Sequence, residues 1–194
     1  MVKKVDSHPR DRLIETALRL FYEQGYLATG INQIIAESQV AKATFYHHFV
    51  SKENLCVAYL QARHIVWMNW LKNSVEKQKS IADRIIGVFG FLSEWMVKCN
   101  FRGCAFLNIS SEVPSLNSEI RAEVVKHKDD LKLYLEQMIS HLKDSDKRYK
   151  HIDIKNNVDM VYVLVEGAIV ASQNYGQVWP IHVARDAVRK LLNI

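Results

Sequence analysis

The chain has 194 residues, of which 48% are hydrophobic and 24% charged, a composition typical of globular proteins with a sizeable core. Three prolines and seven glycines leave little material for the turns of an all-β fold. The formal net charge of +5 permits a polyanionic partner but does not require one, so charge alone assigns no function.

The sequence predicts a cytoplasmic protein without a membrane span. The first twelve residues, MVKKVDSHPRDR, have no apolar core and are unlike a signal peptide. The most apolar later stretch, residues 160–171, is interrupted by Glu166 and is too short to cross a bilayer. Three cysteines, an odd number without a secretory signal, indicate reducing surroundings rather than a disulfide framework.

The first predicted helix follows a short polar arm. Lys3 and Lys4 on this arm can contact a DNA groove or a phosphate, although most short basic termini are simply solvated. Ser7 is the expected N-cap, Pro9 falls in the first turn, and Gly25 is the expected helix-stop glycine. Apolar residues at helical spacing predict one buried face: Leu13, Ile14, Ala17, Leu20 and Phe21.

Residues 29–53, TGINQIIAESQVAKATFYHHFVSKE, predict two short helices joined by a tight turn. Thr29 is the expected N-cap of the first helix. Residues 39–41 make the break, and residues 42–48 form the second helix. This arrangement is typical of a helix-turn-helix.

The second helix of this pair is predicted to have two unlike faces. Phe45 and Phe49 lie four positions apart and can pack inward with Val40. The opposite face carries hydrogen-bond donors with little acid among them: Lys42, Thr44, Tyr46 and His47. A helix that is packed on one side and lined with donors on the other can enter the major groove and meet base edges and phosphates.

The predicted DNA contacts are Thr29, Lys42, Ala43, Thr44, Tyr46, His47 and Lys52. Lys42 and Lys52 flank the helix and are expected to neutralise phosphates, the alternative being ordinary solvated lysines. Thr44 is the candidate for a base or backbone contact, while Tyr46 and His47 are expected to contact the backbone. Thr29 can also let the amides at the start of its helix face a phosphate.

Charge and metal chemistry add little to this assignment. Residues 1–52 hold seven basic residues against five acidic ones, so the prediction of nucleic-acid binding rests on where the donors lie and not on the net charge. A metal site at His47 and His48 is disfavoured because adjacent residues point about 100° apart on a helix. No cysteine or acid is spaced to complete such a site, so neither a metal nor another cofactor is expected. His48 is expected to support a helix interface.

These residues resemble the DNA-binding domain of the tetracycline-repressor (TetR) family, over roughly residues 9 to 60. The positions that agree in order and spacing are Gly25-Tyr26, Thr29, Ile34-Ile35-Ala36, Val40, Lys42, Thr44-Phe45-Tyr46-His47-His48-Phe49 and Ser51-Lys52-Glu53-Asn54-Leu55. The resemblance implies an all-helical, homodimeric transcriptional regulator whose larger C-terminal domain binds a small ligand.

Three residues depart from the common family pattern. Gln39 stands where many members place glycine in the turn; if the turn needs a left-handed residue, Gln39 costs roughly 1–2 kcal/mol relative to glycine. Ala41 replaces a serine cap, which costs about 1 kcal/mol more. Ala43 replaces a frequent glycine, and its methyl group can touch a thymine methyl. These departures leave the fold prediction intact and weaken any inference about the operator sequence.

The remainder of the chain is predicted to be helical. Ser51 is expected to cap a long helix that runs to about residue 77 and links the two halves of the protein. Further helices are predicted at residues 81–99, 104–113, 116–142, 154–175 and 180–192, about nine in all. The predicted architecture is a three-helix DNA-binding domain, residues 1–52, and a larger helical domain for effector binding and dimerisation, residues 53–194.

The last two helices are predicted to form a dimer surface. Their apolar and small residues recur at helical spacing, and the candidates for the interface are Val161, Val165, Ala168, Ser172, Val183, Ala187 and Leu191. The alternative is that these residues pack in the core of a single chain, and some of them must do so. A two-fold bundle, as the family resemblance implies, places two heads on one axis, where they can address half-sites about 34 Å apart.

The ligand-pocket candidates are aromatic and mixed-polar residues of the middle helices: Trp67, Phe89, Trp95, Phe106, Asn108, Tyr134, Met138, Tyr162 and Asn174. For any single aromatic residue, filled core is the usual alternative. Cys99 and Cys104 suggest a redox switch. The alternative is that both cysteines are small buried hydrophobic residues with a packing role.

These features are compatible with three functions. The first is a ligand-responsive DNA-binding regulator, most often a repressor, released from a pseudo-palindromic operator when an effector binds. The second is a regulator without an effector, whose C-terminal half only dimerises. The third, an enzyme using Cys104 as a nucleophile, is disfavoured because no matching Cys/His signature, phosphate loop or metal spacing supports it.

Overall fold

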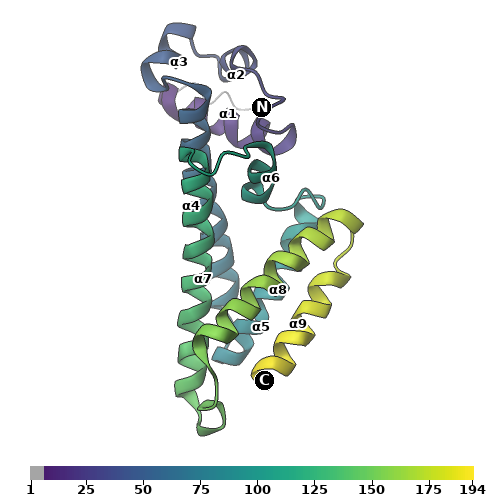
Figure 1. Ribbon diagram of the computed structural model, residues 1–194. Helices are drawn as coiled ribbons and strands as arrows, with labels where there is room; N and C mark the ends of the chain where they lie inside the picture. The colour runs from purple at the N-terminus through teal and green to yellow at the C-terminus, as the bar shows by residue number, and fades with distance from the viewer. Residues whose placement is uncertain (1–6) are drawn as a thin grey trace. The chain divides into compact units, whose positions relative to one another are not determined.

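A computed structural model describes residues 7–194; Lys3 and Lys4, for which groove contact was predicted, lie outside the described residues. Within the described range the regular structure is helical throughout, as predicted (Figure 1). The helices are α1 (Pro9–Glu23), α2 (Ile31–Ser38), α3 (Lys42–His48), α4 (Lys52–Val75), α5 (Ile81–Lys98), α6 (Ala105–Glu112), α7 (Glu119–Ser145), the 3-10 helix η1 (Lys147–Tyr149), α8 (Ile154–Tyr175) and α9 (Trp179–Leu192).

Several helix ends follow from local chemistry, and two of them, at Ser51 and Gly25, were predicted. The hydroxyl of Ser51 accepts the N–H of Asn54 at 3.1 Å, and that of Ser80 accepts the N–H of Asp83 at 3.0 Å, so both serines satisfy amides that the helix start leaves unpaired. Gly25, at φ +99°, ends α1 in the left-handed region that favours glycine.

The predicted cap of α1 is wrong. The N-cap of α1 is His8 rather than Ser7, and the ring Nδ1 of His8 accepts the N–H of Arg10 at 3.4 Å. Pro9 is the first helical residue, as predicted. Because proline favours the first helical position and fixes its own φ there, the residue that immediately precedes it becomes the cap.

The described residues form two compact units. The first contains the residues up to Val66 together with Ala105–Lys126, and the second contains Trp67–Cys104 with His127–Ile194. The division falls within α4 and within α7, so both long helices supply residues to each unit. Within the described residues, no helix combines the length and the apolar character that a membrane crossing requires.

The core of the first unit holds α1, α2 and α3 against the beginning of α4. Leu13, Leu20 and Ile34 are fully buried. The ring of Phe21 packs edge-on against that of Tyr59, with the centroids 5.4 Å apart, which joins α1 to α4. Apolar burial from four helices therefore fixes the position of the short α3, which at seven residues would not be stable alone.

The second unit is built on α5, α8 and α9, which pack on one another, and α8 and α9 run side by side (Figure 1). Its core is aliphatic and aromatic: Leu71, Ile85, Phe89, Leu92, Leu135, Ile139, Val161, Val165, Ile181 and Val188 are at most 1% exposed. Asp153 caps α8 through a 3.2 Å bond from the N–H of Asn156, and Gly176 ends the helix at φ +61°.

Candidate nucleic-acid interface

Helix α3 is packed on one face, as its sequence predicts. Phe45 is fully buried, and Phe49 and Val40 are 4% and 5% exposed. The two phenylalanine rings lie 6.3 Å apart, centroid to centroid. This apolar face anchors the helix to the unit and leaves the opposite face for a partner.

The turn between α2 and α3 has the strained conformation that was expected of Gln39. Its φ is +53° and its ψ is +41°, in the left-handed region. The N–H of Val40 donates to the carbonyl of Ile35 at 3.3 Å, which closes the end of α2. From α1, the guanidinium of Arg12 donates to the carbonyl of Gln39 at 3.3 Å. Ala41, at the N-cap of α3, makes no side-chain bond, so the turn is held by backbone and by α1.

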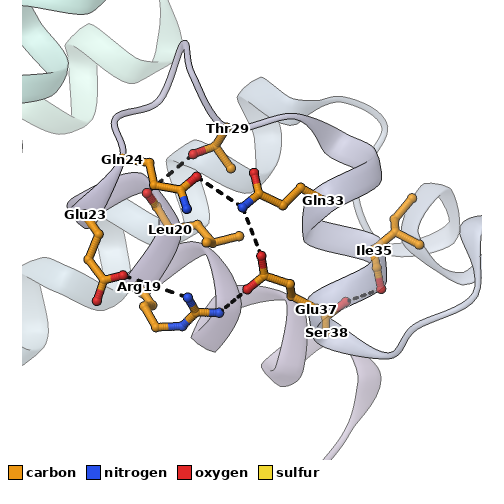
Figure 2. A network of polar contacts seen from close by, with 9 residues as sticks. All are labelled: Arg19, Leu20, Glu23, Gln24, Thr29, Gln33, Ile35, Glu37 and Ser38. Carbon is orange, nitrogen blue, oxygen red and sulfur yellow. Dashed lines mark hydrogen bonds and ion pairs between the residues drawn. The ribbon is translucent and has the colours of Figure 1, made fainter.

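A polar network on the surface joins α1 to α2 (Figure 2). The guanidinium of Arg19 donates to the carboxylate of Glu37, and the amide of Gln33 donates to Glu37 at 2.9 Å and to Gln24 at 3.1 Å. The hydrogen bond from Arg19, with a second from Gln33, lowers the pKa of Glu37. The network thus uses the one acid of α2 to hold that helix in place, a role that the sequence did not reveal.

The predicted donors of α3 are exposed or half-buried. Lys42, Ala43 and His47 are exposed, Tyr46 is 45% exposed, and Thr44 is half-buried. Tyr46 rests edge-on against Phe45, with the ring centroids 5.2 Å apart. This part of α3 is therefore open to solvent and rich in donors, while its aromatic member is supported from below.

Lys52 is held by the fold as well as being a candidate phosphate contact. Its ammonium lies 4.3 Å from the centroid of the Tyr26 ring, a cation–π contact. Partial burial lowers the pKa of Lys52, and it raises the pKa of Tyr26 to about 12. Because the ammonium of Lys52 is held against this ring, it is less free to reach a phosphate than the ammonium of Lys42.

The predicted cap at Thr29 is wrong. The N-cap of α2 is Gly30, which has no side chain to bond an amide. The buried hydroxyl of Thr29 instead donates to the carbonyl of Gly25 at 2.7 Å and to that of Leu20 at 3.4 Å, of which Figure 2 shows the bond to Leu20. Leu20 lies in the last turn of α1, where its carbonyl also accepts the N–H of Gln24 at 2.9 Å, and Gly25 follows the helix. Thr29 therefore fastens the loop after α1, and its side chain is not presented to solvent.

Two basic groups at the start of α1 lie beside the end of α3. The rings of His8 and His48 make an edge contact at 5.2 Å, and His47 and His48 are 5.0 Å apart. The guanidinium of the exposed Arg10 lies 5.5 Å from the centroid of Phe49. Partial burial, followed by the charges of His47, His8 and Arg10, lowers the pKa of His48. Sequence analysis missed Arg10, because only packing brings the start of α1 next to α3.

Helix α6 is fastened to the loop between α1 and α2. A carboxylate oxygen of Glu112 accepts the N–H of Leu27 at 2.7 Å. A Cβ added at Gly25 would lie 3.1 Å from the other oxygen, so the glycine also makes room for this carboxylate. The contact ties a helix from late in the chain to the three-helix head.

The ligand candidates fall into both units. Phe106, which is buried, and Asn108 belong to α6 in the first unit. The others belong to the second unit, where Trp67, Phe89, Trp95 and Met138 are buried, Tyr134 and Tyr162 are half-buried, and Asn174 is exposed. Trp67 and Trp95 are brought together, with ring centroids 5.7 Å apart. Tyr134 and Tyr162 lie instead near the ammonium groups of Lys72 and Lys132.

The face of α8 that was assigned to a partner chain is the inward face of the second unit. Val161, Val165, Ala168 and Ser172 are at most 5% exposed within the single chain. The α9 candidates lie outward: Val183 is 59% exposed, and Ala187 and Leu191 are half-buried. Both faces of α8 are apolar, so periodicity could not tell which of them the chain itself covers.

An apolar groove lies on the outward side of α8 and α9. It encloses about 530 Å³ and is lined by Asp159, Met160, Val163, Leu164, Ala187 and Leu191. Met160 and Val163 are 45% and 65% exposed, and Val170, farther along α8, is 43% exposed. The outward apolar stripe of α8 thus lies next to the α9 candidates.

A helical head that packs a short helix on two phenylalanines and exposes its donors defines a helix-turn-helix DNA-binding protein. The chain matches two family models, "Bacterial regulatory proteins, tetR family" over residues 13–59 and "Tetracyclin repressor-like, C-terminal domain" over residues 82–188. It belongs to the tetR family of transcriptional regulators, and the enzyme hypothesis is set aside.

Two curated relatives are repressors. The chain is 26% identical to the transcriptional repressor NemR of Escherichia coli over 128 residues, which is 65% of this chain and 64% of that protein. It is 28% identical to IcaR of Staphylococcus aureus, the negative transcriptional regulator of the icaADBC biofilm operon, over 64% of this chain and 72% of the relative. The chain thus spans a little less than two thirds of the NemR length.

Solved structures share the fold over nearly the whole chain. The TetR-family regulator SCO4454 from Streptomyces coelicolor has a TM-score of 0.82 at 25% identity, and 96% of each chain is covered. The reduced form of Escherichia coli NemR has a TM-score of 0.79 at 21% identity, with 94% of this chain and 96% of that one covered. The second likeness shows the fold alone.

Proposed function

We propose that this chain is a cytoplasmic, homodimeric transcriptional repressor that binds a pseudo-palindromic operator and leaves it when a small effector binds. The observation that carries the proposal is the outward face of α3, where donors are exposed while Phe45 and Phe49 hold the inner face. The repressors NemR and IcaR among its relatives support repression rather than activation. We assign DNA binding to residues 1–52, and effector binding and dimerisation to residues 53–194.

In this proposal, α3 enters the major groove. Lys42, Tyr46 and His47 are the exposed side chains that bond to phosphates and base edges, with Ala43 against a thymine methyl and Thr44 at the edge of the contact. Arg10 adds a cation at the other end of α3. Thr29 contributes by bracing the loop after α1, and Lys52 by a cation that is partly held on Tyr26.

Replacement of Lys42 by alanine tests the DNA contact. In a dimer the change removes one phosphate-binding cation per subunit, so log K against log salt should become less steep by about 1.8, or about 0.9 for each phosphate that is no longer neutralised. Titration of duplex fragments at several salt concentrations measures this slope. Lys155→Ala is the matched control, since it removes the same charge from an exposed position on α8. An unchanged slope in Lys42→Ala would remove Lys42 from the interface.

We propose that dimerisation uses the outward stripe of α8 and the adjacent face of α9. The exposed and half-buried apolar residues that would be covered are Met160, Val163, Val170, Val183, Ala187 and Leu191. A contiguous apolar surface of this kind is costly to leave in water, and a two-fold axis covers it with the same surface of a second copy.

A charge at Val163 tests this surface. Val163→Asp places a carboxylate in the proposed interface and should shift the protein from dimer to monomer in sedimentation at micromolar concentrations. Val97→Asp, at a 60% exposed position on α5, introduces the same charge elsewhere and should leave the dimer intact. A wild-type protein that sediments as a monomer, or a dimer that Val163→Asp does not weaken, would contradict the assignment.

Effector binding is proposed to act on the spacing of the two heads. Helix α4 begins next to α3 and continues as a 24-residue helix into the second unit, so a tilt at its far end is carried to the head. Glu112 of α6 holds the loop before α2 within the first unit. An effector can weaken DNA binding only to the extent that it binds the DNA-incompetent arrangement more tightly.

A further inference from the structure

Four rings from three helices meet around Trp67 in the second unit. The Trp67 indole makes edge contacts with Phe91 and Trp95 of α5, at centroid distances of 5.4 and 5.7 Å, and with His127 of α7 at 5.4 Å. Phe91 and Trp95 lie parallel, at 6.4 Å and an interplanar angle of 2°. The cluster therefore offers both flat faces and polarised ring edges, the surfaces on which another aromatic ring packs best.

The cluster contains two buried donors. Trp67 and Trp95 are each only 5% exposed, and the indole N–H of neither meets a hydrogen-bond acceptor among the described residues. A buried N–H that gives up water without gaining an acceptor carries a free-energy penalty, and buried tryptophans usually find a partner for this reason. Trp70, three residues after Trp67 on α4, is 49% exposed and keeps its indole at the surface.

We propose that Trp67 and Trp95 recognise a flat aromatic ligand that carries a neutral hydrogen-bond acceptor, such as a ring-conjugated carbonyl. The rings of the cluster supply the stacking surface, and the two indole N–H groups supply donors for the acceptor oxygen. This inference rests on the proposed effector-dependent function and names the chemical class of the effector.

A neutral acceptor fits this cluster better than a carboxylate does. Lys128, which follows His127 on α7, donates to both oxygens of Glu166 at 2.7 and 2.8 Å, so its charge is already matched. A ligand carboxylate would have to be buried on indole donors alone, and an unmatched buried charge is far more costly than a carbonyl. A ligand cation is disfavoured because the unmet groups of both tryptophans are donors.

The test compares two probes of the same size. Both are measured by isothermal titration calorimetry on the full-length protein: 2-acetylnaphthalene, which has a conjugated carbonyl, and the hydrocarbon 2-isopropenylnaphthalene, in which a CH2 group replaces the carbonyl oxygen. We expect the ketone to bind about tenfold more tightly, the factor for one well-placed hydrogen bond. Trp67→Phe and Trp95→Phe keep an aromatic ring but lack the N–H, so each should reduce the preference for the ketone while still binding the hydrocarbon. Trp70→Phe is the matched control and should leave both affinities unchanged.

Equal affinities for the two probes, binding of neither, or a full ketone preference in Trp67→Phe and Trp95→Phe would each overturn the inference. A full ketone preference in these variants is expected if water molecules, and not the ligand, accept the two indole N–H groups. Loss of the hydrocarbon affinity together with the ketone affinity would indicate a packing role for the tryptophans and would also count against it. Operator binding, measured in parallel, separates a failure of the proposed function from a failure of the proposed ligand class. A protein that binds DNA but does not prefer the ketone is still a regulator, and only the inference about its ligand is refuted.

Discussion

Replacement of Gln39 by glycine should stabilise the head of the protein. Gln39 occupies the left-handed region at φ +53°, where an L side chain costs about 1–2 kcal/mol. Glycine avoids that cost but loses more backbone freedom on folding, about 0.5–1 kcal/mol. The net gain is about 0.5–1 kcal/mol, since the Gln39 side chain is exposed and the bond from Arg12 is to the backbone carbonyl, which glycine keeps.

Urea denaturation followed by far-ultraviolet circular dichroism measures this gain, and a melting temperature about 1–4 °C higher should accompany it. Gln39→Ala is the control, because alanine keeps the Cβ and hence the backbone strain while it removes the rest of the side chain. Its stability should stay close to that of the wild type. If alanine stabilises as much as glycine, or glycine destabilises, backbone strain at this turn is not the cause and the reasoning fails.

Two further predictions concern ionisable groups. Lys128 and Glu166 form an ion pair whose side chains are only 12% and 17% exposed, so Lys128→Met should cost about 3–5 kcal/mol in urea denaturation, and adding Glu166→Leu should recover most of it. Equal losses in the single and double variants would show that packing, not the stranded charge, is responsible. His48 has a pKa below its ordinary 6.5, so the unfolded chain binds this proton more tightly and stability should fall as the pH drops below about 6.5. His48→Gln should flatten this slope; parallel pH profiles for wild type and His48→Gln would contradict the assignment.

Sequence patterns located the helix-turn-helix because local rules agree there. Phe45 and Phe49 lie one helical turn apart, and the donors Tyr46 and His47 lie between them, so the order of residues itself predicts one packed and one open face. Gln39 was the one non-glycine residue of the turn whose strain could be anticipated, and its φ bears this out. The cap at Ser51 followed from the same short-range chemistry.

The positions that sequence misjudged depend on neighbours distant in the chain. Thr29 is a good cap by type, yet its hydroxyl donates to the carbonyls of Leu20 and Gly25, at the end of α1 and just after it. The sequence did not predict a role for Arg10, because only tertiary packing brings it next to Phe49. A residue type states which bonds a side chain can make, but the available partners depend on the fold.

The order of residues by itself determined the all-helical class, the position of the DNA-reading helix and most helix ends, because these depend on interactions within a few residues. Tertiary structure alone decided which face of α8 is buried, since Val161 and Val163 are equally apolar and only the packing of the chain covers one and leaves the other in solvent. It also decided that two indole N–H groups from α4 and α5 share one ring cluster, a proximity between segments nearly thirty residues apart that no local pattern encodes.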